Sequence, residues 1–133
     1  MMWAQAFARQ QTHIPIFMSA LCQLPAVTCA FAHNEKIIIM TANSKTLEPM
    51  HDLIKDECGV EMHEDRYRIY GGQDIPGFEA VALGEKVDTA KVEPGMVALC
   101  QQAIKENPDA RAFLFECTEL PPYSDAVRHA TGL

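Results

Sequence analysis

The sequence predicts an α/β fold in which helices cover both faces of a parallel sheet. Short uncharged apolar runs alternate with longer segments of helical periodicity, which is the pattern of βαβ units. The clearest runs are residues 37–40 and 112–115, because turn-forming residues stand on both sides of each. Four consecutive apolar residues are typical of a strand that is buried on both faces. Right-handed crossovers between such strands place the connecting helices in two outer layers.

The N-terminal third predicts a helix, a strand and a second helix. Residues 1–11 have helical spacing, with Trp3, Ala6 and Phe7 on one face. Residues 14–18 form a short apolar run that predicts a strand. Ser19 follows as a candidate cap for a helix that bends at Pro25.

Two further strands and two helices are expected next along the chain. The strand 37–40 is followed by a helix from about residue 46, which Gly59 is suited to end. Residues 67–70 predict another strand, and residues 73–87 a loop. A long helix is expected from residue 88 or 89 to 106, then the strand 112–115, then a helix over 124–130.

Composition excludes several classes of function. The 133 residues carry a net charge of −7 and no basic cluster, which argues against nucleic acid and anionic membranes as partners. The five cysteines are an odd number with no CxxC pair, which favours a reducing cytoplasm over a disulfide framework. The uncharged stretch 14–32 contains two prolines and several polar residues, so it predicts a strand, a turn and a buried helix rather than a membrane span.

Cys117 is predicted to be the reactive centre, because it follows the strand 112–115 directly. In an open α/β sheet, ligands bind outside the carboxyl ends of the strands. Thr118 adds a hydroxyl beside the thiol, and backbone N–H groups there are suited to a carboxylate or an oxyanion. Thr41, Asn43 and Ser44 end the strand 37–40, so we expect them to lie beside Cys117 as a cradle for a small carboxylic acid.

Structural alternatives stand beside this interpretation. A cysteine next to an apolar strand is commonly a small buried hydrophobe. Glu116 and Glu119 flank the thiol, where either could assist proton transfer or simply face water. The histidines show no ligand spacing, and a metal site built from Cys58 and His63 is a weak alternative.

Three stretches carry a resemblance to a known family. FECTELPPY at residues 115–123, continued by ATGL at 130–133, resembles the second cysteine motif of the aspartate/glutamate/hydantoin racemase superfamily. IIMTANS at residues 38–44 resembles the strand and loop that open the second half of that family. IPIFMSAL at residues 14–21 resembles the strand and serine loop before the crossing between its halves.

The resemblance implies a three-layer α/β/α half-domain of the Asp/Glu racemase type, incomplete at both ends. Residues 1–33 would be a remnant of the N-terminal half, and residues 34–133 the C-terminal half that carries Cys117. The implied enzyme is a cofactor-independent, cytoplasmic isomerase that moves a proton at the carbon next to a carboxylate. Cys117 would be catalytic, and the ligand, a small carboxylate or amino acid, would be bound by five residues: Thr118, Thr41, Asn43, Ser44 and Ser19.

The sequence departs from that family in one respect. The family's first cysteine has no counterpart in this chain, so racemisation with two thiols is not expected from it alone. Two alternatives stay open: an inactive module that binds a carboxylate or another subunit, and a decarboxylase of the same superfamily that uses a single cysteine. Apolar surface left uncovered by an incomplete fold predicts a homo-oligomer.

Overall fold

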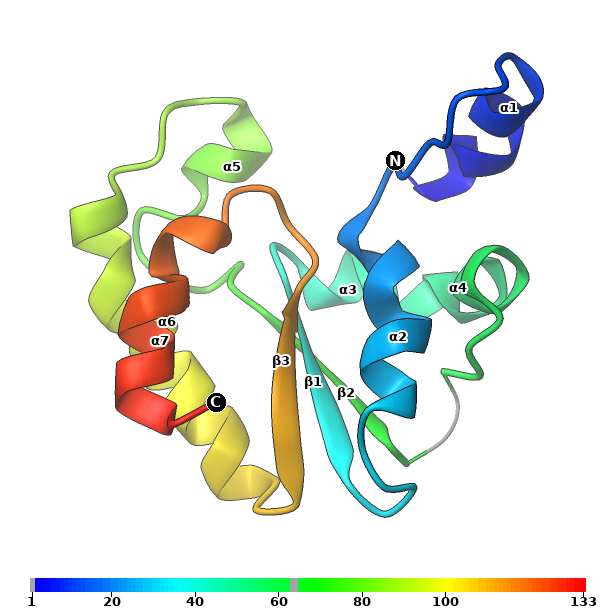
Figure 1. The fold of residues 1–133 in the computed structure, drawn as a ribbon. Helices are drawn as coiled ribbons and strands as arrows, with labels where there is room; N and C mark the ends of the chain where they lie inside the picture. Colours follow the sequence, from blue (N-terminus) through cyan, green and yellow to red (C-terminus); the bar gives the residue numbers. More distant parts are fainter. Residues whose placement is uncertain (1, 63–64) are drawn as a thin grey trace.

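A three-stranded parallel sheet forms the centre of the molecule (Figure 1). In the computed structural model, which describes residues 2–62 and 65–133, the sheet order is β2-β1-β3. The strands are β1 (Lys36–Thr41), β2 (Tyr67–Gly71) and β3 (Ala110–Phe115). The predicted α/β class, with a parallel sheet, is therefore confirmed. The racemase-type arrangement is not confirmed by this small sheet.

β1 is the central strand because it can be buried on both faces. Its four residues Ile37, Ile38, Ile39 and Met40 are fully buried. Side chains alternate along a strand, so Ile38 and Met40 join one core cluster, whereas Ile37 and Ile39 join the other. Burying each such side chain contributes roughly 1.5–3 kcal/mol, so the core on each face is anchored on this strand.

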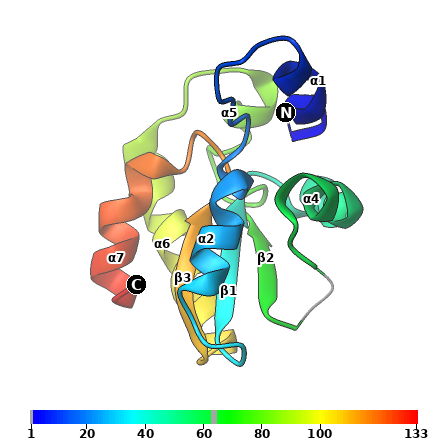
Figure 2. The same cartoon turned by 45° about the vertical axis from the view of Figure 1, so that its right-hand side comes forward.

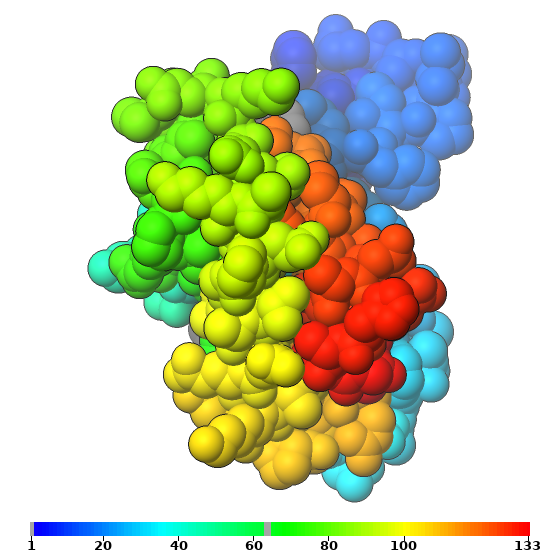
Figure 3. Space-filling model, turned by 90° about the vertical axis from the view of Figure 1, so that its left-hand side faces the viewer, coloured from blue at the N-terminus to red at the C-terminus, as the bar shows by residue number. Residues whose placement is uncertain are grey.

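One face of the sheet is covered by α6 (Thr89–Glu106) and α7 (Ser124–Thr131). Figure 3 shows these two helices packed side by side, with the segment around α5 (Ala80–Leu83) beyond them. The other face is covered by α2 (Leu24–Cys29) and α4 (His51–Cys58) (Figure 1). This gives the layered arrangement that the alternating pattern predicts.

The turns and caps of these helices follow their sequences closely. Asp88 accepts a hydrogen bond from the Lys91 N–H and begins α6, while Gly59 ends α4 with a φ of 68°. The helix expected from residue 46 is interrupted by Pro49, which has no N–H to donate. It divides into α3 (Ser44–Leu47), the 3₁₀ turn η3 (Glu48–Met50) and α4. The loop expected over 73–87 contains the short helix α5, which was missed.

The strand predicted over residues 14–18 is wrong. No strand forms there; the segment runs from α1 (Gln5–Gln10) to the 3₁₀ turn η2 (Ala20–Gln23). Gln5 takes the place of a strand partner: its side chain donates to the Ile16 carbonyl at 2.5 Å and accepts from the Met18 N–H at 2.7 Å. Ile14 and Phe17 are 73% and 78% exposed, so this run of apolar residues is not a core strand.

The N-terminal arm, residues 2–18, leaves several large apolar side chains exposed. Trp3 and Phe7, which the helical spacing placed on one face, are 73% and 67% exposed, whereas Gln5 and Met2 are buried. Figure 2 shows α1 standing above α4, away from the sheet. An ion pair of 2.9 Å between Arg9 and Glu57 joins the two helices.

The uncharged run 112–115 predicted that β3 is buried on both faces, and this prediction is wrong. It is an edge strand that pairs only with β1 within the described chain, and only Ala110 and Leu114 in it are buried. Phe113 and Phe115 are half-buried and pack at 6.3 Å between ring centroids. An uncharged run therefore identified the strand correctly but not its position in the sheet.

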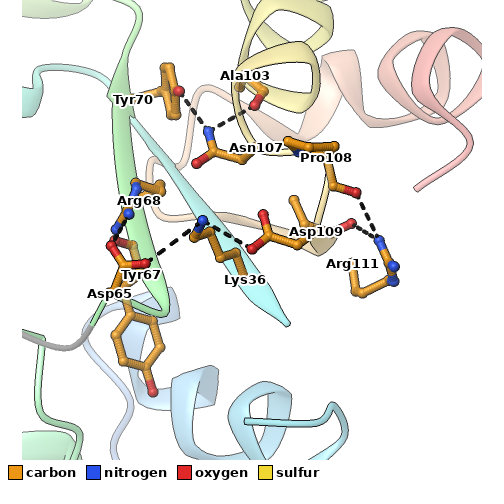
Figure 4. Close-up of polar contacts among 11 residues, drawn as sticks. Lys36, Asp65, Tyr67, Arg68, Tyr70, Ala103, Asn107, Pro108, Asp109 and Arg111 are labelled. Carbon is orange, nitrogen blue, oxygen red and sulfur yellow. Dashed lines mark hydrogen bonds and ion pairs between the residues drawn. The ribbon is translucent and has the colours of Figure 1, made fainter. Parts of the chain in front are cut away.

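A polar network fixes the amino ends of the strands (Figure 4). The Lys36 ammonium lies 3.0 Å from an Asp109 carboxylate oxygen and 3.8 Å from one of Asp65. The hydrogen bond from Lys36 holds the pKa of Asp109 below its ordinary value, and Arg68 does the same for the pKa of Asp65. These contacts lie at the opposite end of the sheet from Cys117.

None of the described helices has the length and apolar character needed to cross a membrane.

Candidate functional site

The candidate site lies where β1 and β3 end side by side. The Glu116 N–H donates to the Met40 carbonyl at 2.7 Å, which continues the pairing of the two strands by one residue. Thr41 and Glu116 therefore leave the sheet together. Thr41 shares a face with Ile37 and Ile39, and Glu116 shares that face with Leu114, since side chains alternate along a strand.

The Glu116 carboxylate is held by two hydroxyl groups. Thr41 Oγ1 donates to one carboxylate oxygen at 2.9 Å, and Ser19 Oγ lies at 3.5 Å from the other. Thr41 is buried, while Glu116 and Ser19 are half-buried. Ser19 also accepts from the Leu21 N–H and so begins η2, as predicted. These bonds bring together three segments far apart in the sequence.

The Cys117 thiol opens into a cavity of about 240 Å³. Cys117 is half-buried and packs partly against the core on the α6 side of the sheet. Ser19, Glu116 and Thr118 line the same cavity. The structure thus brings together three of the six predicted site residues here, namely Ser19, Cys117 and Thr118.

A larger cavity of about 540 Å³ lies on the other side of Glu116. Thr41 and Asn43 line it, together with apolar side chains that include Leu21, Leu47 and Phe78. Glu116 lines both cavities. Thr41 and Asn43 therefore line a different cavity from Cys117, and Glu116 is the residue that the two cavities share.

Asn43 and Ser44 form hydrogen bonds that fix the start of α3. The Asn43 amide oxygen accepts from the Lys45 N–H at 3.0 Å and caps α3. The Ser44 N–H donates to Gln73 Oε1 at 3.2 Å, so this donor is already used. Ser44 does not line either cavity, and its predicted contact with a ligand has no support from its position.

The charges around the two cavities are negative. Glu79 lines the larger cavity, and N–H groups of its own residue and of Gly77 hold the pKa of its carboxyl low. None of the described residues that line either cavity is a lysine or an arginine. A bound carboxylate would therefore depend on hydroxyl and backbone N–H donors here.

The remaining cysteines lie away from this site. All five are free thiols. Burial raises the pKa of the Cys100 thiol to about 12 and that of Cys58 to about 11, where Cys22 adds to the effect. Among the described residues, no group of three His, Cys, Asp or Glu side chains could hold a metal ion. His63, from the alternative metal pair, lies outside the described residues.

Comparison with known proteins identifies several close relatives of the chain. The chain is 56% identical over 133 residues to dimethylsulfoniopropionate lyase 7 of Emiliania huxleyi, covering 97% of the chain and 39% of that protein. It is 53% identical to lyase 3 of the same organism, over 99% of the chain and 36% of that protein. The chain is similar to dimethylsulfoniopropionate lyases.

A protein with the same name from a different organism is also similar to the chain. The dimethylsulfoniopropionate lyase of Durusdinium sp. clade D is 52% identical over 99% of the chain and 44% of its own length. The chain thus spans about two fifths of the length of these three relatives. No family model matches the chain, and no solved structure matches it.

These relatives contradict the assignment to the aspartate/glutamate/hydantoin racemase superfamily and the isomerase activity that it implied. A thiol at the end of a strand can serve as a proton acceptor in several classes of reaction, so the motif around Cys117 did not distinguish an isomerase from other enzymes. The decarboxylase alternative was closer, since it too is a lyase, but its substrate differs.

Proposed function

We propose that this chain carries the reactive thiol of a lyase that cleaves dimethylsulfoniopropionate. The observation that carries the proposal is the 46–56% identity to dimethylsulfoniopropionate lyases over 95–99% of the chain. The position of Cys117 in a cavity at the carboxyl end of the sheet supports it, because ligands of open α/β sheets bind at this edge.

The substrate's own structure defines the reaction. Its sulfonium group is attached one carbon further along than the carbon next to its carboxylate. When a base takes a proton from the carbon next to the carboxylate, the electron pair of that bond forms a carbon–carbon double bond. The carbon–sulfur bond breaks, and sulfur keeps its electron pair. The products are dimethyl sulfide, acrylate and a protonated base.

Cys117 is the proposed base. A thiolate is the form that accepts a proton, and a partly exposed thiol at a cavity is accessible to a substrate. Thr118 lines the same cavity as Ser19 and Cys117 and carries a hydroxyl donor for the substrate carboxylate, whereas the Ser19 hydroxyl donates to Glu116. Charge on that carboxylate grows as the proton leaves, so donors placed there stabilise the transition state. A cytoplasmic location, favoured by the cysteine content, stays a prediction.

The decisive experiment measures dimethyl sulfide in the headspace above the chain after addition of dimethylsulfoniopropionate. We expect release by the unmodified chain and a loss of about 100-fold or more in the Cys117→Ser variant, because a serine hydroxyl at neutral pH is a far weaker base than a thiolate. Cys29→Ser is the matched control, since Cys29 is an exposed thiol that lines neither cavity.

Two results would count against the proposal. One is release no faster than in a blank without protein. The other is a Cys117→Ser variant as active as the unmodified chain, which would assign the base to another group.

A further inference from the structure

Glu116 is a half-buried carboxylate that has no cationic partner among the described residues. No ion pair joins it to any residue that the structure describes. Its bonds come from the neutral hydroxyls of Thr41 and Ser19. A partly buried charge costs free energy unless it is compensated, and two neutral donors compensate it less than a cation does. The position is therefore electrostatically suited to a positively charged ligand.

The side chains around Glu116 indicate which kind of positively charged ligand fits beside its carboxylate. The larger cavity presents apolar side chains, among them Leu21, Leu47 and Phe78. A primary ammonium or a guanidinium needs several hydrogen-bond acceptors. A fully alkylated sulfonium or quaternary ammonium group needs no acceptor, because it has no N–H or S–H to donate and its charge is spread over methyl and methylene groups. Glu79, the other carboxylate of this cavity, already accepts from the N–H groups of its own residue and of Gly77. The Glu116 carboxylate beside apolar side chains therefore matches the second kind of cation.

Resting on the proposed lyase function, we propose that Glu116 is the specificity-determining residue that recognises the sulfonium group of the substrate. Cys117 and Glu116 are consecutive and line one cavity, so a short zwitterion can place its α-carbon near the thiol and its sulfonium near the carboxylate. The methyl groups then face the apolar cavity, which also accepts the uncharged dimethyl sulfide once it has formed.

The test compares two ligands of nearly the same shape by isothermal titration. One is 3-(trimethylammonio)propionate, a zwitterion with a quaternary ammonium in place of the sulfonium, and the other is 4,4-dimethylpentanoate, its carbon isostere, which is uncharged at the same end. We expect the unmodified chain to bind the zwitterion about tenfold or more tightly, and Glu116→Gln to remove that preference. In turnover, Glu116→Gln should raise KM more than it lowers kcat.

Glu79→Gln is the matched control. Glu79 lines the same large cavity, but its carboxylate accepts from the N–H groups of its own residue and of Gly77, so we expect the preference to remain. Glu116→Asp retains the charge and should retain a cation preference, which keeps the test valid if Glu116→Gln folds poorly.

The outcomes separate the two proposals. An active chain whose Glu116→Gln variant keeps the full cation preference, or whose Glu116→Asp variant loses it, would overturn the role of Glu116 and leave the lyase proposal standing. A chain that releases no dimethyl sulfide, yet loses its cation preference in Glu116→Gln, would overturn the lyase and support onium recognition.

Discussion

Cys100 is fully buried in the core between α6 and the sheet, and burial raises the pKa of its thiol to about 12. In the unfolded chain the same thiol ionises near its ordinary value of 9.0. Between these values the unfolded chain binds fewer protons than the folded chain, so the free energy of unfolding falls as pH rises.

We therefore expect Cys100→Ala to flatten the pH dependence of stability between about pH 9 and 12, measured by urea unfolding. Removal of the sulfur itself should cost on the order of 1 kcal/mol at neutral pH. Part of the slope should remain, because burial also raises the pKa of Tyr70 to about 12. Cys29→Ala is the control, and an unchanged slope in Cys100→Ala would refute the prediction.

At the scale of single residues, the sequence predicted Cys117 at the end of a strand and Ser19 as a helix cap, because both follow local rules. For Glu116 the sequence left two interpretations, assistance in proton transfer and, more commonly for a loop carboxylate, exposure to water. Alternation along β3 was the available signal: it places Glu116 on the face of Leu114, opposite to Cys117. The hydroxyls that hold Glu116 come from segments 75 and 97 residues away, and no local pattern predicts such pairs.

At the scale of elements, the junction between β2 and α3 positions the Thr41–Ser44 turn. A Cβ added at Gly71 would meet the backbone nitrogen of Ser44 and the Gln73 side chain that accepts from it. Backbone cannot move aside as a flexible side chain can, so a methyl group here would displace the start of α3. The close approach therefore requires glycine.

Gly71→Ala should destabilise the chain by roughly 1–3 kcal/mol and also weaken ligand binding, because the turn lines the larger cavity. Gly59→Ala is the matched control: Gly59 has a φ of +68° with open space around it, so its replacement costs about 1 kcal/mol and leaves binding unchanged. Thermal unfolding and titration with 3-(trimethylammonio)propionate measure the two effects. Equal binding in both variants would contradict the account.

Elements differed in how well the sequence predicted them. β1, α6 and α7 were found because their periodicity and caps agree with their environment. The run at 14–18 has the same apolar character as a strand, but it finds its backbone partner in the Gln5 side chain instead of a sheet. Strand formation depends on a neighbouring strand, which composition does not reveal.

At the scale of the whole molecule, the amino and carboxyl ends of the strands differ in their surroundings. The Lys36–Asp109 network holds the amino ends (Figure 4), while the carboxyl ends open into the two cavities. The exposed Trp3, Phe7 and Phe17 gather on the N-terminal arm. Association into a homo-oligomer stays a prediction, which light scattering checks.

The proposed lyase reaction requires that Cys117 faces the space where the substrate binds. Alkylation of each cysteine by iodoacetamide, followed by peptide mass spectrometry, tests it most directly. We expect rising concentrations of dimethylsulfoniopropionate to slow the alkylation of Cys117 and to leave that of the exposed Cys29 unchanged. Alkylation of Cys117 at the same rate with and without the substrate would contradict the claim.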